Sequence, residues 1–333
     1  MMPMERTLKG KHVLVTGGAG FIGSHLVDRL IAEGVGRLTI IDDFFLGKSA
    51  NLTEAYDRMP DLNVMGVDAS DEKAVRKALT SLNTVDVVFD LAVIPLNTSL
   101  KYPQYSFETS VLITSIFCEL LREGQFKTLV HFSSSEAYGS ARTVPMSEDH
   151  PLDPRTPYAA AKAAGDHLVR SYVATFGVDA LIVRPFNNYG PRQTDQQYAP
   201  IIPIMLRCVF EERVFSIFGD GQQTRDYIYV TDTARAVLDL YKHFRESGQV
   251  VNVASGQEIS VVDLKTKIER VLGREVPCQY LDPRPGDVRR HRADITLLKS
   301  LIDFEPEISI EEGLARTAEF YRERVNRSRN GAY

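Results

Sequence analysis

Tyr158 and Lys162 stand four residues apart in the stretch YAAAK. On a helix this spacing places both side chains on one face. A protonated lysine beside a phenol lowers the phenol's pKa from about 10 towards working pH, so that the phenolate accepts a proton from a hydroxyl group. Alone, the pattern is common and usually marks a solvated helix face. Its meaning therefore depends on what else the chain contains.

A glycine-rich turn near the N-terminus is the second chemical feature. Gly17, Gly20 and Gly23 follow the apolar run HVLVT and open a helical pattern. This spacing permits a tight turn and lets backbone N–H groups approach a pyrophosphate at a helix N-terminus, which favours an anion. Asp42 ends the next apolar run about 20 residues further on, where a carboxylate binds both ribose hydroxyls of NAD and repels the phosphate of NADP. The sequence therefore predicts NAD as the cofactor.

Four more residues complete the predicted cofactor site. Phe21 and Ile22 belong to the glycine-rich turn itself, and Leu91 ends the fourth apolar run. Asp68 follows the third run, where its carboxylate either accepts a hydrogen bond from the adenine amino group or only caps a helix.

A cluster of hydroxyl groups and one acid ends the fifth apolar run. Ser134, Ser135 and Glu136 lie in the stretch SSSEAYG, directly after LVHF. Glu136 has three interpretations: it caps a helix, it forms a structural pair in a loop, or it removes a proton from a substrate.

Composition limits the class of protein. The chain has 333 residues, 44% of them apolar and 25% charged, with a net charge of -5. These values are ordinary for a globular protein. The net charge is not positive, so we expect neither nucleic acid nor membrane as a partner.

Cys118, Cys208 and Cys278 form no CxxC pair, and we expect no metal site. Without a signal-peptide pattern or a membrane-length apolar run, the expected location is the cytoplasm.

Short apolar runs alternate with helical patterns through the first half of the chain, which predicts a doubly wound parallel α/β sheet of the Rossmann type. The expected strands are His12–Thr16, Leu38–Asp42, Asn63–Val67, Val87–Leu91, Leu129–Ser133, Leu181–Arg184 and Val250–Val253. The expected helices lie near 21–34, 71–82, 104–123, 157–176 and 201–212.

Prolines break this rhythm after Arg184, which predicts a second, smaller lobe. We expect a cofactor-binding domain over residues 1–185 with a return segment at about 227–255. The expected substrate-binding lobe is C-terminal, mostly helical and formed by 186–226 and 256–325, with a cleft between the two parts. The polar tail, 326–333, is expected to fray.

Five stretches together resemble one family: TGGAGFIG, SSSEAYG, YAAAK, RPFNNYGPRQ and GDGQQTRDYIYV. Over about residues 10–325 the chain resembles the extended short-chain dehydrogenase/reductase family, specifically its NAD-dependent nucleotide-sugar epimerases, dehydratases and decarboxylases. The resemblance implies that Tyr158 is the catalytic base and that Lys162 orients Tyr158 and the nicotinamide ribose. It also implies that Ser134 bonds the 4-hydroxyl of the sugar.

The resemblance implies a nucleotide diphosphate sugar as substrate, with UDP favoured. Asn187 and Arg225 match family residues that hold the diphosphate, and Arg192 is expected to reach the sugar. Arg289 and Arg292 are further candidates, because guanidinium groups bind phosphates and carboxylates bidentately. If the sugar is a uronate, a cation must face carbon 6, and the candidates are Arg192, Arg292 and Lys101.

Two positions depart from the family pattern. Ser110 stands where the family often has Asn, and Asp90 replaces the His of the usual His-Leu-Ala-Ala at the fourth strand. Details on the nicotinamide side therefore do not transfer to this chain directly.

Glu136 bears on the reaction that the resemblance leaves open. Family enzymes first oxidise the 4-hydroxyl to a ketone, which acidifies the hydrogen on carbon 5. A carboxylate near carbon 5 favours elimination of water or loss of carbon dioxide, with Ser135 beside it as a poor acid. The first alternative is a 4-epimerase, in which Glu136 is a bystander, and a distant alternative is a non-catalytic NAD-bound scaffold.

The apolar helices near 104–123 and 157–176 also match the family. There, two such helices pair in a four-helix bundle, so the expected assembly is a homodimer.

Overall fold

A seven-stranded, fully parallel sheet forms the centre of the protein, in the order β10-β6-β5-β4-β1-β2-β3. The computed structural model describes residues 6–194, 200–283 and 288–329. The strands are β1 (His12–Thr16), β2 (Arg37–Ile41), β3 (Asn63–Met65), β4 (Val85–Asp90), β5 (Phe126–Phe132), β6 (Asp179–Pro185) and β10 (Gln249–Val253). From β1 the sheet continues through β2 to β3 on one side, and from β4 it continues through β5 and β6 on the other. At such a reversal of strand order, a crevice opens at the carboxyl ends of the strands.

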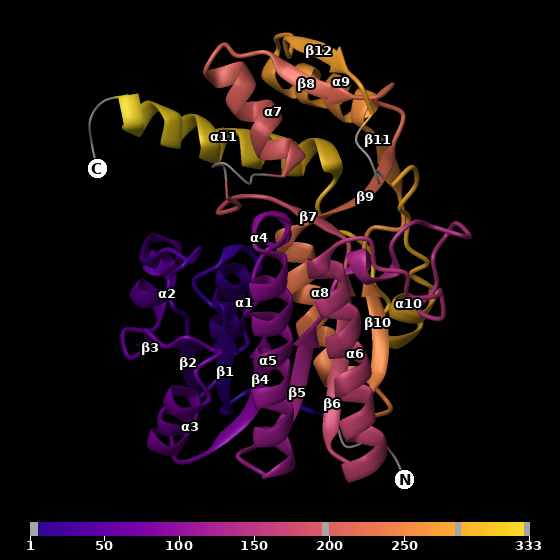
Figure 1. Cartoon of the computed structure of the whole chain (residues 1–333). Helices are drawn as coiled ribbons and strands as arrows, with labels where there is room; N and C mark the ends of the chain where they lie inside the picture. The colour runs from indigo at the N-terminus through magenta and orange to yellow at the C-terminus, as the bar shows by residue number, and fades with distance from the viewer. Residues whose placement is uncertain (1–5, 195–199, 284–287, 330–333) are drawn as a thin grey trace.

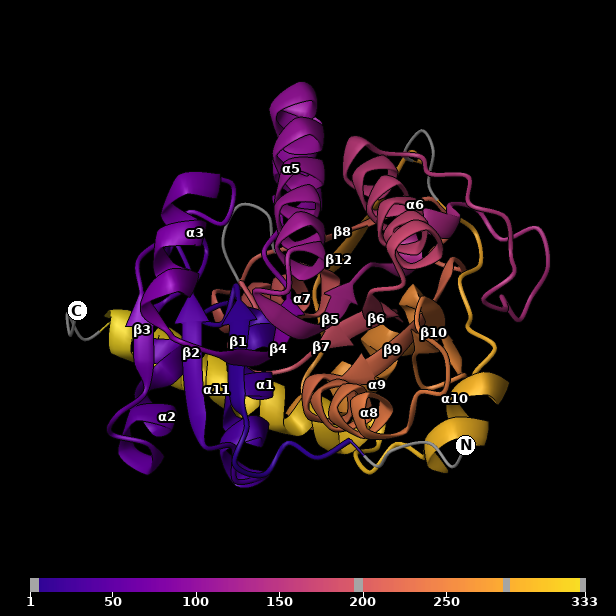
Figure 2. The same ribbon diagram turned by 90° about the horizontal axis from the view of Figure 1, so that it is seen from below.

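Helices cover both faces of this sheet, as the view along it shows (Figure 2). On one face lie α1 (Phe21–Ala32) and α8 (Val230–His243), whose buried residues pack with those of the central strands. The other face carries α3 (Glu72–Ser81), α5 (Pro103–Arg122) and α6 (Pro157–Phe176). The expected Rossmann-type architecture is therefore confirmed.

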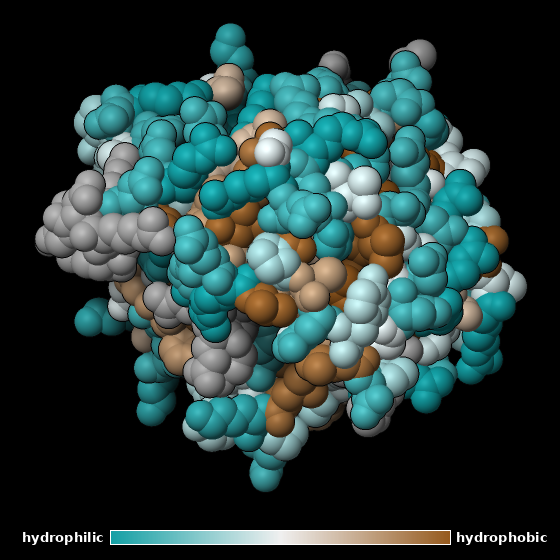
Figure 3. Space-filling model, turned by 90° about the horizontal axis from the view of Figure 1, so that it is seen from above, coloured by the Kyte–Doolittle hydropathy of each residue, from teal (hydrophilic) through white to brown (hydrophobic). Residues whose placement is uncertain are grey.

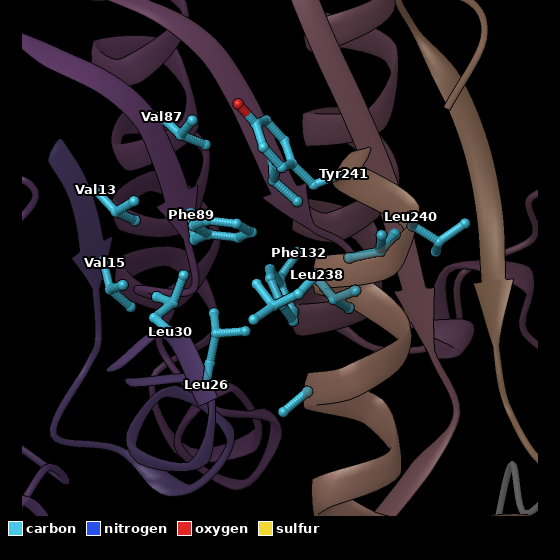
Figure 4. Packing of buried hydrophobic residues seen from close by; sticks show 14 of the residues in the cluster. Val13, Val15, Leu26, Leu30, Val87, Phe89, Phe132, Leu238, Leu240 and Tyr241 are labelled. Atoms are coloured by element: carbon cyan, nitrogen blue, oxygen red, sulfur yellow. The ribbon is translucent and has the colours of Figure 1, made fainter. Parts of the chain in front are cut away.

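Apolar side chains from the sheet, α1 and α8 interlock in the main core (Figure 4). Phe89 of β4 is fully buried there and meets the ring of Tyr241 at a centroid distance of 6.1 Å. Because β4 and β1 lie centrally and are buried on both faces, their sequences are nearly continuous apolar runs, which made them predictable.

A smaller lobe stands at the carboxyl end of the sheet (Figure 1). Its helices are α7 (Ile201–Phe210), α9 (Val261–Leu272) and α11 (Ile310–Arg329). Two small sheets accompany them: β11 (Glu258–Ser260), β9 (Thr224–Tyr229) and β7 (Asn187–Tyr189) in one, β12 (Cys278–Leu281) and β8 (Phe215–Phe218) in the other. The face of the molecule at this end is mainly hydrophilic, with small brown hydrophobic areas between polar side chains (Figure 3).

The remaining elements are short and connect the larger ones. They are η1 (Ser49–Leu52), α2 (Thr53–Arg58), α4 (Leu96–Lys101), η2 (Ser135–Tyr138) and α10 (Thr296–Ile302).

The sequence did not predict the two small sheets of the lobe or the helix α8. Strands as short as β7 and β11 have three residues each, too few to display a period. Residues 326–329 of the tail continue α11, whereas 330–333 lie outside the described residues. Strand β10 of the expected return segment does join the large sheet, but the division into domains stays a prediction.

Replacing Phe89 by Ala is expected to lower the free energy of unfolding by about 3–5 kcal/mol, because the cavity left in a fully buried core cannot collapse. The matched control is Phe45→Ala, since Phe45 is 60% exposed, and it should change stability by less than about 0.5 kcal/mol. Denaturant unfolding of both variants measures the difference. Equal losses for the two variants would contradict this assignment of the core.

Candidate active site

A cavity of about 1030 Å³ lies between the carboxyl end of the large sheet and the lobe. This volume is at the upper end of the range for ligand pockets. Fourteen of the predicted site residues line it: Gly17, Gly20, Phe21, Ile22, Gly23, Asp42, Asp68, Leu91, Ser134, Glu136, Tyr158, Lys162, Asn187 and Arg225. The cavity therefore joins the glycine-rich turn, the YAAAK helix, the SSSEAYG turn and the lobe.

The glycine-rich turn leaves no room for side chains. Gly17 has φ +65°, in the left-handed region, and a Cβ on Gly23 would lie 2.1 Å from the Gly17 carbonyl oxygen. Helix α1 begins directly after this turn, so its first N–H groups face the cavity. An anion held by backbone N–H groups needs this geometry. The turn therefore fits the pyrophosphate of NAD.

Asp42 follows β2 at the edge of the same cavity. One of its carboxylate oxygens accepts a hydrogen bond from the Ala19 N–H at 2.8 Å, and the other accepts one from the Phe44 N–H at 2.8 Å. Burial raises the pKa of Asp42, and the two N–H donors oppose this shift. The carboxylate is thus fixed against the glycine-rich turn, where the predicted ribose hydroxyls would reach its remaining lone pairs.

Asp68 also borders the cavity, but it is exposed and accepts hydrogen bonds from the Ser70 N–H at 2.8 Å and the Ser70 hydroxyl at 2.7 Å. The N-cap of α3 is Asp71, whose side chain accepts from the Ala74 N–H. Asp68 therefore does not cap this helix, and its contact with adenine stays a prediction.

Tyr158 and Lys162 lie in the first turns of α6. The helix begins after Thr156, whose hydroxyl accepts a hydrogen bond from the Ala159 N–H at 3.2 Å. This cap fixes the start of α6, and Lys162 donates from Nζ to the Phe132 carbonyl at the end of β5. The Ser134 hydroxyl, in turn, is hydrogen-bonded to the Tyr158 phenol.

The electrostatics of this group work against ionisation. Burial raises the pKa of Tyr158 to about 12; the hydrogen bond to Ser134 lowers it and the negative charge of Glu136 raises it. Burial likewise lowers the pKa of Lys162, and the carboxylates of Asp90 and Asp166 oppose this shift. A phenolate at Tyr158 therefore requires positive charge nearby.

Ser135 lies next to these residues but is buried and does not line the cavity. Its backbone carbonyl meets Nε2 of His291 at 3.3 Å, behind the turn η2. The turn therefore presents Ser134 and Glu136 to the cavity, whereas Ser135 packs into the protein.

Three predicted arginines do not line the cavity, because each is occupied elsewhere. Arg192 forms ion pairs with Asp28 at 2.6 Å and Glu54 at 3.4 Å. Arg289 pairs bidentately with Asp220 at 2.7 and 3.0 Å. The third, Arg292, donates from Nε to the Gly256 carbonyl at 2.8 Å.

The other two predicted substrate residues do reach the cavity. Arg225 donates to the backbone carbonyls of Thr224 and Val288 at 2.9 and 2.7 Å, which orients its guanidinium group. Asn187 donates to the Asp226 carbonyl at 3.3 Å. Both line the cavity from strands of the lobe, Asn187 from β7 and Arg225 from β9.

Several lining residues were not found in the sequence, among them Asn97, Tyr105 and Arg213. Arg213 stands just before β8, a strand of four residues that no periodic pattern revealed. Predicting β8 would have directed attention to this cation. Tyr105 is 55% exposed on α5, and nothing in its sequence context marked it.

The two departures from the family pattern occupy structural positions near the nicotinamide side. The Ser110 hydroxyl accepts a hydrogen bond from the Ile94 N–H at 3.3 Å. Asp90 accepts one from the Thr16 hydroxyl at 2.9 Å. Both residues thereby fix the segment after β4, of which Leu91 and Ile94 line the cavity.

Within the described residues, no group of three His, Cys, Asp or Glu side chains has the arrangement of a metal site. Over the same part of the chain, none of the helices combines the length and apolar character needed to cross a membrane.

The glycine-rich turn, Asp42 and the Tyr158–Lys162 pair define an NAD-binding enzyme of the Rossmann class. The family model described as the NAD dependent epimerase/dehydratase family matches residues 13–254, and the chain belongs to this family. It is an enzyme of the NAD-dependent group that modifies nucleotide sugars.

Individual relatives differ in the reactions their names give. The UDP-glucose 4-epimerase of Mycolicibacterium smegmatis is 36% identical over 313 residues, covering 93% of this chain and 98% of that protein. The UDP-N-acetyl-alpha-D-glucosaminuronate decarboxylase of Bacillus cytotoxicus is 32% identical over 329 residues, covering 95% and 99%. A solved UDP-N-acetylglucosamine 4-epimerase from Methanobrevibacter ruminantium, in complex with UDP-N-acetylmuramic acid, is 33% identical, with a TM-score of 0.86 and coverage of 95% and 99%.

Replacing Gly23 by Ala is expected to abolish NAD binding, because the added Cβ would lie 2.1 Å from a backbone oxygen of the turn. The turn must then open, and its backbone N–H groups would no longer point together at the pyrophosphate. Gly66→Ala is the control, since a Cβ there meets nothing within 4 Å. Isothermal titration with NAD measures both variants. Unchanged affinity in Gly23→Ala would show that this turn does not hold the cofactor.

Proposed function

We propose that the protein is a UDP-sugar 4-epimerase. The observation that carries this proposal is that Ser134, Tyr158 and Lys162 line one cavity whereas Ser135 does not, so the groups for proton transfer are present without an acid at Ser135 beside Glu136. Such a group can remove the proton of a sugar hydroxyl and later return it. Bound NAD would supply the hydride acceptor.

Each of these residues has a defined task in the proposed reaction. Ser134 holds the 4-hydroxyl of the sugar, and Tyr158 as phenolate takes its proton while the hydrogen on carbon 4 leaves as hydride. The resulting 4-ketone would turn over within the cavity and would accept the hydride on its other face, while Tyr158 would return the proton to the oxygen. Ser134 and Tyr158 would end in their starting states.

The lobe side of the cavity suits a nucleotide diphosphate. Arg213, Arg225 and Asn187 line it there, and guanidinium groups bind phosphate oxygens bidentately. Relatives whose names include UDP-sugars support uridine as the base, and two of the three relatives described above are named as 4-epimerases.

Elimination or decarboxylation, which Glu136 led us to expect, is the second candidate. Its support is that Glu136 does line the cavity. Against it, Ser135 does not face the cavity, so that position provides no acid beside Glu136. Among the described lining residues the cations are Lys162, Arg213 and Arg225.

The cations expected to face a carboxylate at carbon 6 are placed elsewhere. Arg192 and Arg292 have the partners given above, and Lys101 lies over the ring of Tyr102 at 5.2 Å. This arrangement supports a sugar that is neutral at carbon 6. The comparisons likewise favour 4-epimerisation, the alternative, over the reaction expected first.

Glu136→Gln separates the two candidates. If the enzyme is a 4-epimerase, the variant should keep turnover within about tenfold of the parent, because no step needs a base at carbon 5. A role as general base predicts a loss of at least ~100-fold. Product analysis after incubation with UDP-hexoses, UDP-N-acetylhexosamines and UDP-uronates measures this, with Tyr158→Phe as the inactive control. The larger loss in Glu136→Gln would overturn the proposal.

We also infer a homodimer formed through α5 and α6. The two helices pack side by side on one face of the sheet (Figure 2). Two apolar side chains of α5 point outwards, with exposed fractions of 38% for Phe107 and 46% for Leu112. Pairing with a second copy would bury them in a four-helix bundle.

Sedimentation velocity at micromolar concentration is expected to show a dimer, and Leu112→Glu should shift it to a monomer, since a charge would be buried in the bundle. Lys127→Glu, on the exposed part of β5, is the control and should leave the dimer intact. A monomeric parent protein would exclude this assembly.

A further inference from the structure

Lys162 is only 5% exposed, at the border of the cavity. Its side chain is buried, and its hydrogen bond to the protein goes to the neutral carbonyl of Phe132. Within the described residues it forms no direct ion pair. An isolated buried ammonium group is costly and tends to lose its proton, so a counter-charge must lie close by if Lys162 is to stay protonated.

One buried carboxylate near Lys162 is already compensated. Asp166, one turn further along α6, is paired with Arg184 at 2.8 Å, and both side chains are almost completely buried. The charge of this pair sums to zero. Asp166 is therefore a weak partner for a second cation.

Asp90 is the other buried carboxylate, and its hydrogen-bond partners are a hydroxyl and an imidazole. One oxygen accepts from the Thr16 hydroxyl at 2.9 Å, and the other lies 3.1 Å from Nδ1 of His131. The side chains of Asp90 and His131 are 1% and 2% exposed. Among the described residues, neither a lysine nor an arginine is paired with Asp90.

His131 holds Asp90 from the neighbouring strand. Its Nδ1 donates to the Asp90 carboxylate at 3.1 Å, because a carboxylate oxygen accepts. Among the described residues, its Nε2 is buried without a hydrogen-bond partner, and a Cβ on Gly165 of α6 would lie only 3.0 Å from it. The ring is therefore fixed between Asp90 and α6.

The geometry of the sheet brings Asp90 to Lys162. In the parallel pairing of β4 and β5, Asp90 lies beside His131, the residue before Phe132. The carbonyl of Phe132 is the group that Lys162 contacts. Burial lowers the pKa of Lys162, and the charge of Asp90 is the strongest influence against this shift.

We propose that Asp90 is the buried counter-charge of Lys162 and, through it, a positioning residue for proton transfer at Tyr158. The carboxylate holds the ammonium group charged in a desolvated position. That positive charge favours the phenolate of Tyr158 over the phenol. The proposal holds for epimerisation and elimination alike, because both begin with proton removal from the 4-hydroxyl.

The Asp90 carboxylate also fixes the backbone of Leu91 and Ala92, which line the cavity. The Thr16 hydroxyl that donates to Asp90 accepts hydrogen bonds from the backbone N–H groups of Leu91 and Ala92 at 3.0 and 2.9 Å. A purely structural role through Thr16 is therefore the competing explanation, and the test must separate the two.

Asp90→Asn keeps the shape of the side chain and removes its charge. The other carboxylate that acts on Lys162 is Asp166, which is paired with Arg184, and this pair is unchanged in the variant. We expect the alkaline limb of the pH profile of kcat to move to lower pH by about one unit and the maximum to fall about tenfold, since one unit of pKa corresponds to a factor of ten.

The profile is measured with the UDP-sugar that the parent enzyme converts fastest. Asp86→Asn is the matched control, on the same strand about 13 Å away and paired with Lys127 at 2.6 Å, and its profile should match the parent. A lower kcat at every pH with no movement of the limb would overturn the proposal and indicate the structural role.

A second measurement does not depend on activity. If Asp90 and Lys162 compensate each other, the double variant Asp90→Asn/Lys162→Met removes both buried charges and should unfold at a higher temperature than either single variant. If the decrease in unfolding temperature of the double variant equals the sum of the decreases of the two single variants, the pairing of Asp90 with Lys162 is contradicted. The pairing would also be contradicted if neither Asp90→Asn nor the double variant Asp90→Asn/Lys162→Met folded. If the turnover products disfavour epimerisation, the pH profile and the unfolding temperatures still test the role of Asp90.

Discussion

A buried lysine at the carboxyl end of β5 is the constraint on which the proposed proton transfer depends. Lys162 reaches the Phe132 carbonyl only because α6 begins at a fixed point, set by the Thr156 cap and Pro157. Tyr158, one turn earlier, is then directed at Ser134. Removing the charge would leave a phenol whose buried position strongly disfavours ionisation.

The parallel sheet makes this arrangement possible, because all its strands deliver their carboxyl ends to one edge. The glycine-rich turn, the segment after β4 and the SSSEAYG turn meet there, and the lobe closes the cavity from the opposite side. We propose that the chemistry and cofactor binding belong to this edge of the sheet. The nucleotide end of the substrate would be recognised by β7 and β9 of the lobe, which carry Asn187 and Arg225.

Local patterns predicted the sheet and many of the residues that line the cavity. What they missed depends on contacts between residues far apart in the chain. The turn around Gly17–Gly23 and the Tyr158–Lys162 spacing are each encoded within a few residues, so both could be found without the structure. Arg192 and Arg289 are held by Asp28 and Asp220, which lie far away in the chain. No local signal reveals such partners, and the short strands of the lobe likewise exist only through pairing.

Glu136 remains the residue on which the reaction type depends, since it lines the cavity beside the proposed base. Turnover of UDP-glucose and UDP-N-acetylglucosamine in deuterium oxide, followed by mass spectrometry and NMR, tests this most directly. Epimerisation at carbon 4 predicts a product of unchanged mass with no solvent deuterium at carbon 5. Deuterium at carbon 5, or a product that has lost water, would show that a base removes the proton there and would contradict the proposed epimerase.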